Sequence, residues 1–194
     1  MVLPPRPMKI QNNIKLVILQ HPKESRSPLS TTKTVVDTLS NVTHKIGLSW
    51  RSFTQIAGAG ANPKEWAVLY LGTKKGSSEW AEMPFAITDP KDLLVKKSSI
   101  KGLLLLDGSW KESKTMWWRN PWLLKLNRIV LNQTPTAKYD SIRKEPRVNC
   151  LSTIEAATFM LAALGDAGAA TGLSNAFSAF MRTKKESKDI DLSK

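Results

Sequence analysis

Four short apolar runs along the chain predict buried β-strands. They are Lys15–Leu19, Ala67–Leu71, Gly102–Leu106 and Arg128–Leu131. Three of the four are almost wholly apolar and do not alternate with polar residues, which is typical of strands whose two faces are both covered. We therefore expect a parallel sheet with other elements packed on each side.

Helical spacing of apolar residues appears between these runs. In the first interval it links Val35, Val36, Leu39, Val42 and Ile46. The Trp-rich segment SWKESKTMWWRNPW follows the third run and should be helical until Pro121 stops it. A further helix face after the fourth run is marked by Ile154, Ala157, Leu161 and Leu164. Strands that alternate with helices predict an α/β fold.

The C-terminal part of the chain changes character after this helix. Gly165, Gly168 and Gly172 should break it, and a second helix of roughly Ser174–Met181 should follow. Residues 182–194 are charged and nearly free of aliphatic side chains, so we expect a flexible tail. No linker divides the 194 residues, which predicts one domain over 1–194.

The net charge of the chain indicates an anionic binding partner. The chain has 29 Lys and Arg against 16 Asp and Glu, for a formal net charge of +13. Such a balance favours a polyanion such as nucleic acid, through steering and counterion release, although many basic proteins have no such partner. No protein partner is predicted.

Cysteine and histidine usage narrows the chemistry. A lone cysteine, Cys150, excludes an internal disulfide and a zinc site built from cysteines, and it fits a reducing cytoplasm. His21 and His44 are far apart in the sequence, so no metal is predicted. The N-terminus lacks the apolar core of a secretory signal. The stretch 154–181 is interrupted by charged residues and glycines, which favours a buried helix pair over a membrane span.

The segment LLLLDGSWKESKTM, Leu103–Met116, is the first that can carry chemistry. In open parallel sheets, ligands bind beyond the carboxyl ends of the strands, and Asp107 lies at such an end. The alternative is that Asp107 caps a turn, as Asp-Gly pairs often do.

A second candidate segment is CLSTIEAATFML, where Ser152 and Glu155 have the S-x-x-E spacing of a helix capping box. A helix start also presents free N–H groups to a carboxylate or phosphate. In the segment LQHPKE, His21 and Glu24 directly follow the first strand, where they either bind substrate or cap the next helix.

The segment AKYDSIRKEPR is rich in basic residues and holds one aromatic side chain. It contributes Lys138, Tyr139, Arg143, Lys144 and Arg147. RNA phosphates and a stacked base would need this combination, and a solvated charged loop is the alternative.

Taken in order, these motifs resemble the DTW-domain proteins, the tRNA-uridine aminocarboxypropyltransferases. Asp107, Ser109 and Trp110 match the Asp-Thr-Trp signature, with a serine that keeps the hydroxyl of threonine. Two other signatures also match, the second through Leu151, Ser152, Thr153, Glu155 and Ala156, and the first through His21, Pro22 and Glu24. The resemblance covers roughly residues 10–165.

The resemblance implies a SPOUT-like α/β fold with a C-terminal knot around S-adenosylmethionine. It also implies transfer of the 3-amino-3-carboxypropyl group of S-adenosylmethionine to N3 of a tRNA uridine, with release of methylthioadenosine. Asp107 would be the catalytic carboxylate. S-adenosylmethionine would be held by Asp107, Gly108, Ser109, Trp110, Leu151, Ser152, Thr153 and Glu155. RNA would be bound by His21, Glu24, Lys138, Tyr139, Arg143 and Arg147.

Two residues in these sets could have a structural role in place of a binding role. Trp110 would pack against the adenine or fill the core, and Glu155 would bind the ligand or only complete its cap. Many family members carry zinc-binding cysteines ahead of the His-Pro motif, which this chain lacks. A metal-supported N-terminal element is therefore not expected, and RNA placement would differ.

Three other functions stay open. The chain could be a SPOUT-type RNA methyltransferase that uses the same co-substrate at a different carbon, it could act on rRNA, or it could be a non-catalytic RNA-binding module. A serine hydrolase is disfavoured because the chain has no G-x-S-x-G elbow and no late histidine.

Overall fold

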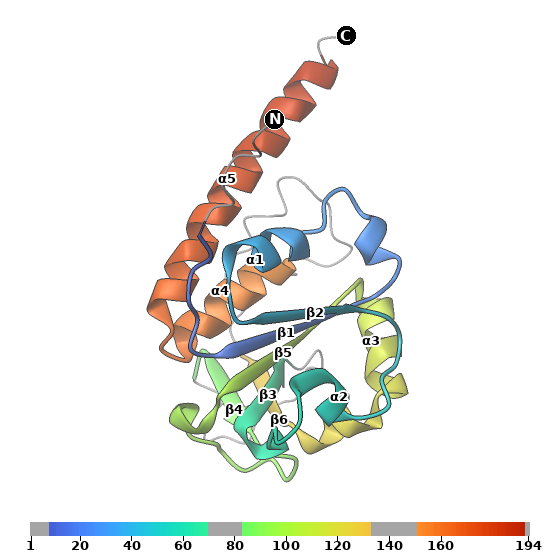
Figure 1. Ribbon diagram of the computed structural model, residues 1–194, viewed down its shortest axis with the longest axis vertical. Coiled ribbons are helices and arrows are strands. Elements are labelled where there is room, and N and C mark those ends of the chain that lie inside the picture. Colours follow the sequence, from blue (N-terminus) through green and yellow to red (C-terminus); the bar gives the residue numbers. More distant parts are fainter. Residues whose placement is uncertain (1–7, 70–82, 133–150, 193–194) are drawn as a thin grey trace.

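The centre of the molecule is a six-stranded sheet. The computed structural model shown in Figure 1 describes residues 8–69, 83–132 and 151–192. Its strands are β1 (Lys15–Gln20), β2 (Val42–Ile46), β3 (Trp66–Leu69), β4 (Phe85–Thr88), β5 (Gly102–Asp107) and β6 (Asn127–Leu131). Their order across the sheet is β2-β1-β5-β3-β6-β4, and every neighbouring pair is parallel except β4 with β6. The predicted α/β class with a mainly parallel sheet is confirmed.

Helices cover both faces of this sheet. They are α1 (Thr32–Thr38), α2 (Phe53–Ala57), α3 (Trp110–Arg119), α4 (Thr153–Ala163) and α5 (Ala167–Leu192), with short 3₁₀ turns at η1 (Glu24–Arg26), η2 (Pro63–Glu65), η3 (Lys97–Ser99) and η4 (Pro121–Lys125). One face carries α1, α4 and α5, and the other carries α2, α3 and η4 (Figure 1). The fold is therefore a three-layer sandwich.

The apolar strands fill both interfaces of the sandwich. In β1, Leu16 and Ile18 face the cluster under α1, α4 and α5, while Val17 and Leu19 face the cluster under α2 and η4. All four side chains are fully buried, and full burial of such a side chain stabilises the fold by about 1.5–3 kcal/mol. This two-sided burial explains why the run is continuously apolar. The four predicted strands correspond to β1, β3, β5 and β6 within two residues, except that residues 70–71 of the second prediction lie outside the described residues.

The prediction that Val42 and Ile46 continue the helix of Val35 and Leu39 is wrong. Helix α1 ends at Thr38, Leu39 is already extended, and Val42–Ile46 forms β2 alongside β1. The segment VTHKI is rich in β-branched residues, which lose side-chain entropy in a helix and pack well on a sheet. An apolar spacing that merely coincides with a helical repeat misled the prediction.

The prediction for the three C-terminal glycines is only partly right. Gly165, with φ +92°, ends α4, but Gly168 and Gly172 lie within α5. A Cβ on Gly172 would lie 2.1 Å from Ile10 Cδ1, so this glycine lets the helix approach the N-terminal segment. Helix α5 also continues past Met181 to Leu192, and it projects beyond the body of the domain (Figure 1). The segment expected as a tail is thus helical through Leu192.

Three further expectations concern what the fold contains. Among the described residues, no helix has the length and apolarity to cross a lipid bilayer. In the same residues, no cluster of three or more His, Cys, Asp or Glu is placed to hold a metal ion. The C-terminal knot stays a prediction, because residues 133–150, which join β6 to α4, lie outside the described part of the chain.

Candidate active site

The last residues of the two most buried strands meet at one edge of the sheet. Gln20 ends β1, Asp107 ends β5, and the two are register partners in the parallel β1–β5 pair. Parallel strands present their carboxyl ends at a common edge, where ligands bind in open α/β sheets. The position that the sequence predicted for Asp107 is the one found.

The Asp107 carboxylate joins three elements through hydrogen bonds. Its Oδ2 accepts from Gln20 Nε2 at 2.7 Å and from Thr32 Oγ1 at 2.5 Å, and its Oδ1 accepts from Thr153 Oγ1 at 2.6 Å. Only 9% of the residue is exposed. A carboxylate has about four acceptor positions, so these three donors from the described residues leave roughly one position, on Oδ1. The group is therefore fixed in orientation by β1, α1 and α4 together.

A second layer of contacts holds Gln20 in place. Its amide nitrogen also donates to Ser30 Oγ at 2.9 Å, and its amide oxygen lies 3.0 Å from His44 Nε2 on β2. Since an amide oxygen only accepts, the His44 proton in this contact is on Nε2. Burial lowers the pKa of His44 below its ordinary value, and the negative charge of Asp107 opposes this only in part. His44 is thus held as a neutral donor.

His21 extends the site from β1 toward α3. Its backbone N–H donates to the Asp107 carbonyl at 2.8 Å, and its Nδ1 accepts from the Lys23 N–H at 3.2 Å and lies 3.7 Å from Glu112 Oε1. Partial burial raises the pKa of Glu112, but hydrogen bonds from Ser109 and the nearby His21 and Lys23 outweigh it, so the pKa falls below its ordinary value. Glu112 is consequently a stable anion beside the site.

Two helices begin at this edge, each with a capping box. The predicted box at Ser152 and Glu155 is confirmed: the Glu155 N–H donates to Ser152 Oγ at 3.4 Å, and the Ser152 N–H donates to Glu155 Oε2 at 2.9 Å. An equivalent box joins Ser109 and Glu112 at the start of α3. We did not predict this second box, although it has the same S-x-x-E spacing. N-caps of this kind contribute about 1 kcal/mol each.

Gly108 shows why a glycine follows the aspartate. A Cβ at this position would lie 3.0 Å from Glu112 Cβ and 3.2 Å from His21 Cβ. Such contacts are tighter than nine in ten real Cβ contacts, so a larger residue would push the α3 start away from His21. The Asp-Gly pair therefore does more than form a turn, because it brings two site elements together.

The predicted site residues fall into three groups. Those that the structure gathers around the sheet edge are His21, Glu24, Asp107, Gly108, Ser109, Ser152, Thr153 and Glu155. Trp110 is half-buried in the first turn of α3, and Leu151 packs beside the α4 cluster. The rest, Lys138, Tyr139, Arg143 and Arg147, lie outside the described residues.

Some outcomes differ from what the sequence suggested. His21 is 9% exposed and Glu24 7% exposed, so both are buried in this structure, and their contact with RNA stays a prediction. The sequence reasoning missed Gln20, Thr32 and His44. A signal existed only for Gln20, a polar residue that ends an apolar strand.

Comparison with known proteins identifies the family of this chain. The family model described as "DTW domain" matches residues 2–185. The chain belongs to the DTW-domain family. Its match to a mouse (Mus musculus) protein named tRNA-uridine aminocarboxypropyltransferase 2 has 30% identity over 84% of this chain and 51% of that protein. An Arabidopsis thaliana protein named tRNA-uridine aminocarboxypropyltransferase A is 29% identical over 80% of this chain and 64% of that protein.

The DTW-domain match is broader than any match to a single relative. A Macaca fascicularis protein named tRNA-uridine aminocarboxypropyltransferase 2 is 26% identical over 84% of this chain and 51% of its own length. The chain thus spans between about half and two thirds of the curated relatives it matches. No solved structure matches the chain significantly.

Proposed function

We propose that this chain is a tRNA-uridine aminocarboxypropyltransferase. It would move the 3-amino-3-carboxypropyl group of S-adenosylmethionine to N3 of a tRNA uridine and release methylthioadenosine. The observation that carries the proposal is the hydrogen bond between Thr153 and Asp107, because it joins two of the three family signatures at the carboxyl edge of the sheet. The names of the curated relatives support the same activity.

The residues at this edge fit the chemistry of S-adenosylmethionine. Its sulfonium and ammonium groups are cationic, and the edge gathers the carboxylates of Asp107, Glu112 and Glu155 in a chain with a formal charge of +13. Its carboxylate is anionic and suits the helix starts at Ser109 and Ser152, where backbone N–H groups and the helix dipole favour negative charge. We assign Ser109, Ser152 and Thr153 to holding it.

The reaction needs a proton acceptor and an aligned nucleophile. S-adenosylmethionine supplies an activated carbon next to its sulfur. A bond from uridine N3 to that carbon forms while the bond between that carbon and sulfur breaks. The electron pair of the broken bond stays on sulfur. The N3 proton must leave, and Asp107 Oδ1, which accepts one hydrogen bond from the described residues, is the acceptor we propose. Thr32 and Gln20 hold Oδ2 and so orient the carboxylate.

The RNA contacts complete the proposal. Arg143 and Arg147 would bind RNA phosphate or the carboxylate of S-adenosylmethionine, since a guanidinium pairs with either planar anion. His21 and Glu24 would reach the uridine after a local rearrangement of the turn that follows β1. Replacement of both arginines with alanine should weaken tRNA binding and flatten its salt dependence.

The by-product of the reaction tests the proposal. The full chain is incubated with S-adenosylmethionine and unmodified tRNA, and the small-molecule product is identified by mass spectrometry. Methylthioadenosine together with an aminocarboxypropyl-uridine supports the proposal, whereas S-adenosylhomocysteine would show a methyltransferase. An rRNA fragment as the only productive acceptor would correct the substrate. The absence of any shift in melting temperature with S-adenosylmethionine would favour a non-catalytic RNA-binding module.

The role of Asp107 needs a matched pair of variants. Asp107→Asn removes the charge and keeps the size, and Asp37→Asn does the same at an exposed carboxylate on α1. General-base contributions are about 10²–10⁴-fold, so Asp107→Asn should lower kcat by at least about 100-fold while Asp37→Asn leaves it unchanged. Full transfer activity in Asp107→Asn would refute the assignment.

A further inference from the structure

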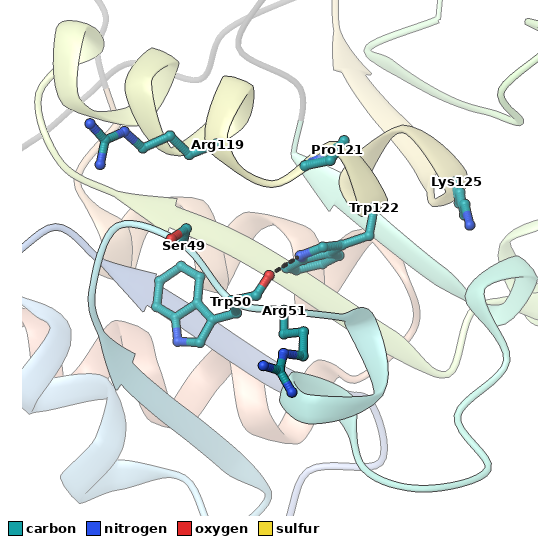
Figure 2. A pocket seen from close by; sticks show the side chains of 7 residues that line it. All are labelled: Ser49, Trp50, Arg51, Arg119, Pro121, Trp122 and Lys125. Atoms are coloured by element: carbon teal, nitrogen blue, oxygen red, sulfur yellow. Dashed lines mark hydrogen bonds between the residues drawn. The ribbon is translucent and has the colours of Figure 1, made fainter.

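A basic pocket lies on the opposite layer of the molecule from α4 and α5. It has a volume of about 700 Å³ and is open to solvent. Its walls come from the loop between β2 and α2 and from the end of α3 with η4 (Figure 2). The lining residues are Ser49, Trp50, Arg51, Arg119, Pro121, Trp122 and Lys125, and we refer to it as the Trp50 pocket.

Hydrogen bonds hold the two walls of the Trp50 pocket together. Asn120 is fully buried; its Oδ1 accepts from the Trp50 N–H at 2.8 Å, and its Nδ2 donates to the carbonyls of Leu48 and Met116 at 3.0 and 2.7 Å. Trp122 Nε1 donates to the Trp50 carbonyl at 3.0 Å (Figure 2). A buried, satisfied amide of this kind fixes the backbone around it. The pocket is therefore preformed.

The lining is positively charged and has no acid to neutralise it. Arg51, Arg119 and Lys125 are exposed, and none of their charged groups is paired within the described part of the chain. Trp50 is half-buried and is the aromatic surface available to a ligand, whereas Trp122 is only 8% exposed and lies deeper. Cations around an aromatic ring suit phosphates and a stacked base.

A basic track connects the Trp50 pocket with the Asp107 site. Lys111, Lys114 and Trp118 are exposed at spacings of three and four residues along α3, so they share one face of that helix, and Trp118 is 74% exposed. The helix starts beside Asp107 and ends at Arg119, a rise of about 14 Å. At the other wall, the Gly47 N–H donates to the Gln20 carbonyl, and three residues from Gly47 to Trp50 span at most about 10 Å.

From this geometry we propose that the Trp50 pocket binds an unpaired nucleotide of the RNA substrate, next to the uridine that is modified. The base stacks on Trp50, and Arg51 and Arg119 bind the flanking phosphates, for which the planar guanidinium is well suited. The inference rests on the proposed function, because it assigns the pocket to the same RNA. It explains why Arg51, Arg119 and Lys125 have no acidic partner among the residues that the structure describes.

A charge-matched pair of double variants tests the phosphate contacts. Arg51→Ala with Arg119→Ala removes two exposed cations from the pocket, and Lys91→Ala with Lys96→Ala removes two exposed cations between β4 and β5. Binding of unmodified tRNA and of single-stranded oligouridine is measured over a series of salt concentrations. Two lost contacts should make the slope of log K against log[salt] shallower by about 1.4 for the single strand. Equal slopes for both double variants would overturn the proposal.

Replacement of Trp50 tests the stacked base. Stacking on an aromatic side chain contributes enough that Trp50→Leu should weaken oligouridine binding by about 5- to 100-fold, while Trp50→Phe keeps most of the affinity. Melting temperatures of both variants show that binding is measured on folded protein. The same affinity for wild type, Trp50→Leu and Trp50→Phe would exclude stacking. If wild-type protein bound a duplex RNA more tightly than oligouridine, and Trp50→Leu kept that preference, the pocket would not bind an unpaired nucleotide.

The failures of the two proposals have different signatures. If wild-type protein releases methylthioadenosine with tRNA, but the pocket variant matches its control in RNA affinity and in KM, the pocket assignment is wrong and the function stands. If the pocket variant loses RNA binding while wild-type protein forms no product, the pocket assignment stands and the function is wrong.

Discussion

The hydroxyl of Thr32 offers a direct measure of the network around Asp107. Thr32 is 1% exposed, and its Oγ1 donates to Asp107 Oδ2 at 2.5 Å. Thr32→Val keeps the shape of the side chain and removes this donor. A hydrogen bond to a charged group contributes about 1.5–3 kcal/mol, so we expect the free energy of unfolding to fall by about 2 kcal/mol. The urea midpoint should fall by about 1 M.

Thr34→Val is the matched control for this measurement. Thr34 lies two residues later on α1 and is half-buried, and its hydroxyl makes no hydrogen bond with the described residues. Its replacement should change stability by less than about 0.5 kcal/mol. Both valine substitutions are also made in the Asp107→Asn variant, which lacks the charged acceptor. In that background, the loss of unfolding free energy caused by Thr32→Val should be smaller by at least about 0.5 kcal/mol. If Thr32→Val were as mild as Thr34→Val, the network would not stabilise the site as we describe.

Three other predictions test the fold and its pH dependence. Gly102→Ala would place a Cβ 2.3 Å from the Trp66 ring and should lower the free energy of unfolding by about 1–3 kcal/mol. Gly168→Ala meets nothing within 4 Å and should raise the free energy of unfolding by about 0.5–1 kcal/mol. Thermal unfolding measures both, and a Gly102→Ala variant more stable than Gly168→Ala would contradict the packing. Burial lowers the pKa of His44 from 6.5, so the contribution of neutral His44 to stability is present above pH 6.5 and is lost as the pH falls through the folded pKa. Urea midpoints measured between pH 7.5 and 5 should therefore fall more in wild type than in His44→Gln. Parallel curves for the two proteins would refute this. Ser152→Ala should cost about 1 kcal/mol through the lost N-cap, and an unchanged urea midpoint would argue against the capping box.

Sequence patterns predicted the central strands because burial on both faces leaves a strong signal. Three of the four runs are nearly all apolar, and Asp107 follows the most uniform of them. The edge strand β2 is only half-buried, so its sequence is not a continuous apolar run. Its Val42 and Ile46 happen to continue the helical spacing of the apolar residues in α1. Strand β4 is only four residues long and has no distinct pattern of its own.

The partners of Asp107 could not be predicted in the same way. Gln20 meets Asp107 only through the β1–β5 register, and Thr32 does so only because α1 packs against α4 and begins at this edge. Such meetings depend on strand order and helix docking, which periodicity does not encode. The capping boxes leave a local signal in the sequence because their two residues are three positions apart, and Ser109 with Glu112 has the same S-x-x-E spacing as Ser152 with Glu155.

The hydrogen bonds on Asp107 span 87 residues to Gln20, 75 to Thr32 and 46 to Thr153. During synthesis from the N-terminus, β1 and β2 would emerge together, but β1 could not pair with β5 until residue 107 had left the ribosome. Long-range pairing of this kind is slow to form. The last donor arrives only with α4, so the hydrogen bonds on Asp107 would be completed after most of the sheet has assembled. A nascent chain halted ahead of residue 153 would therefore hold the aspartate without its final restraint.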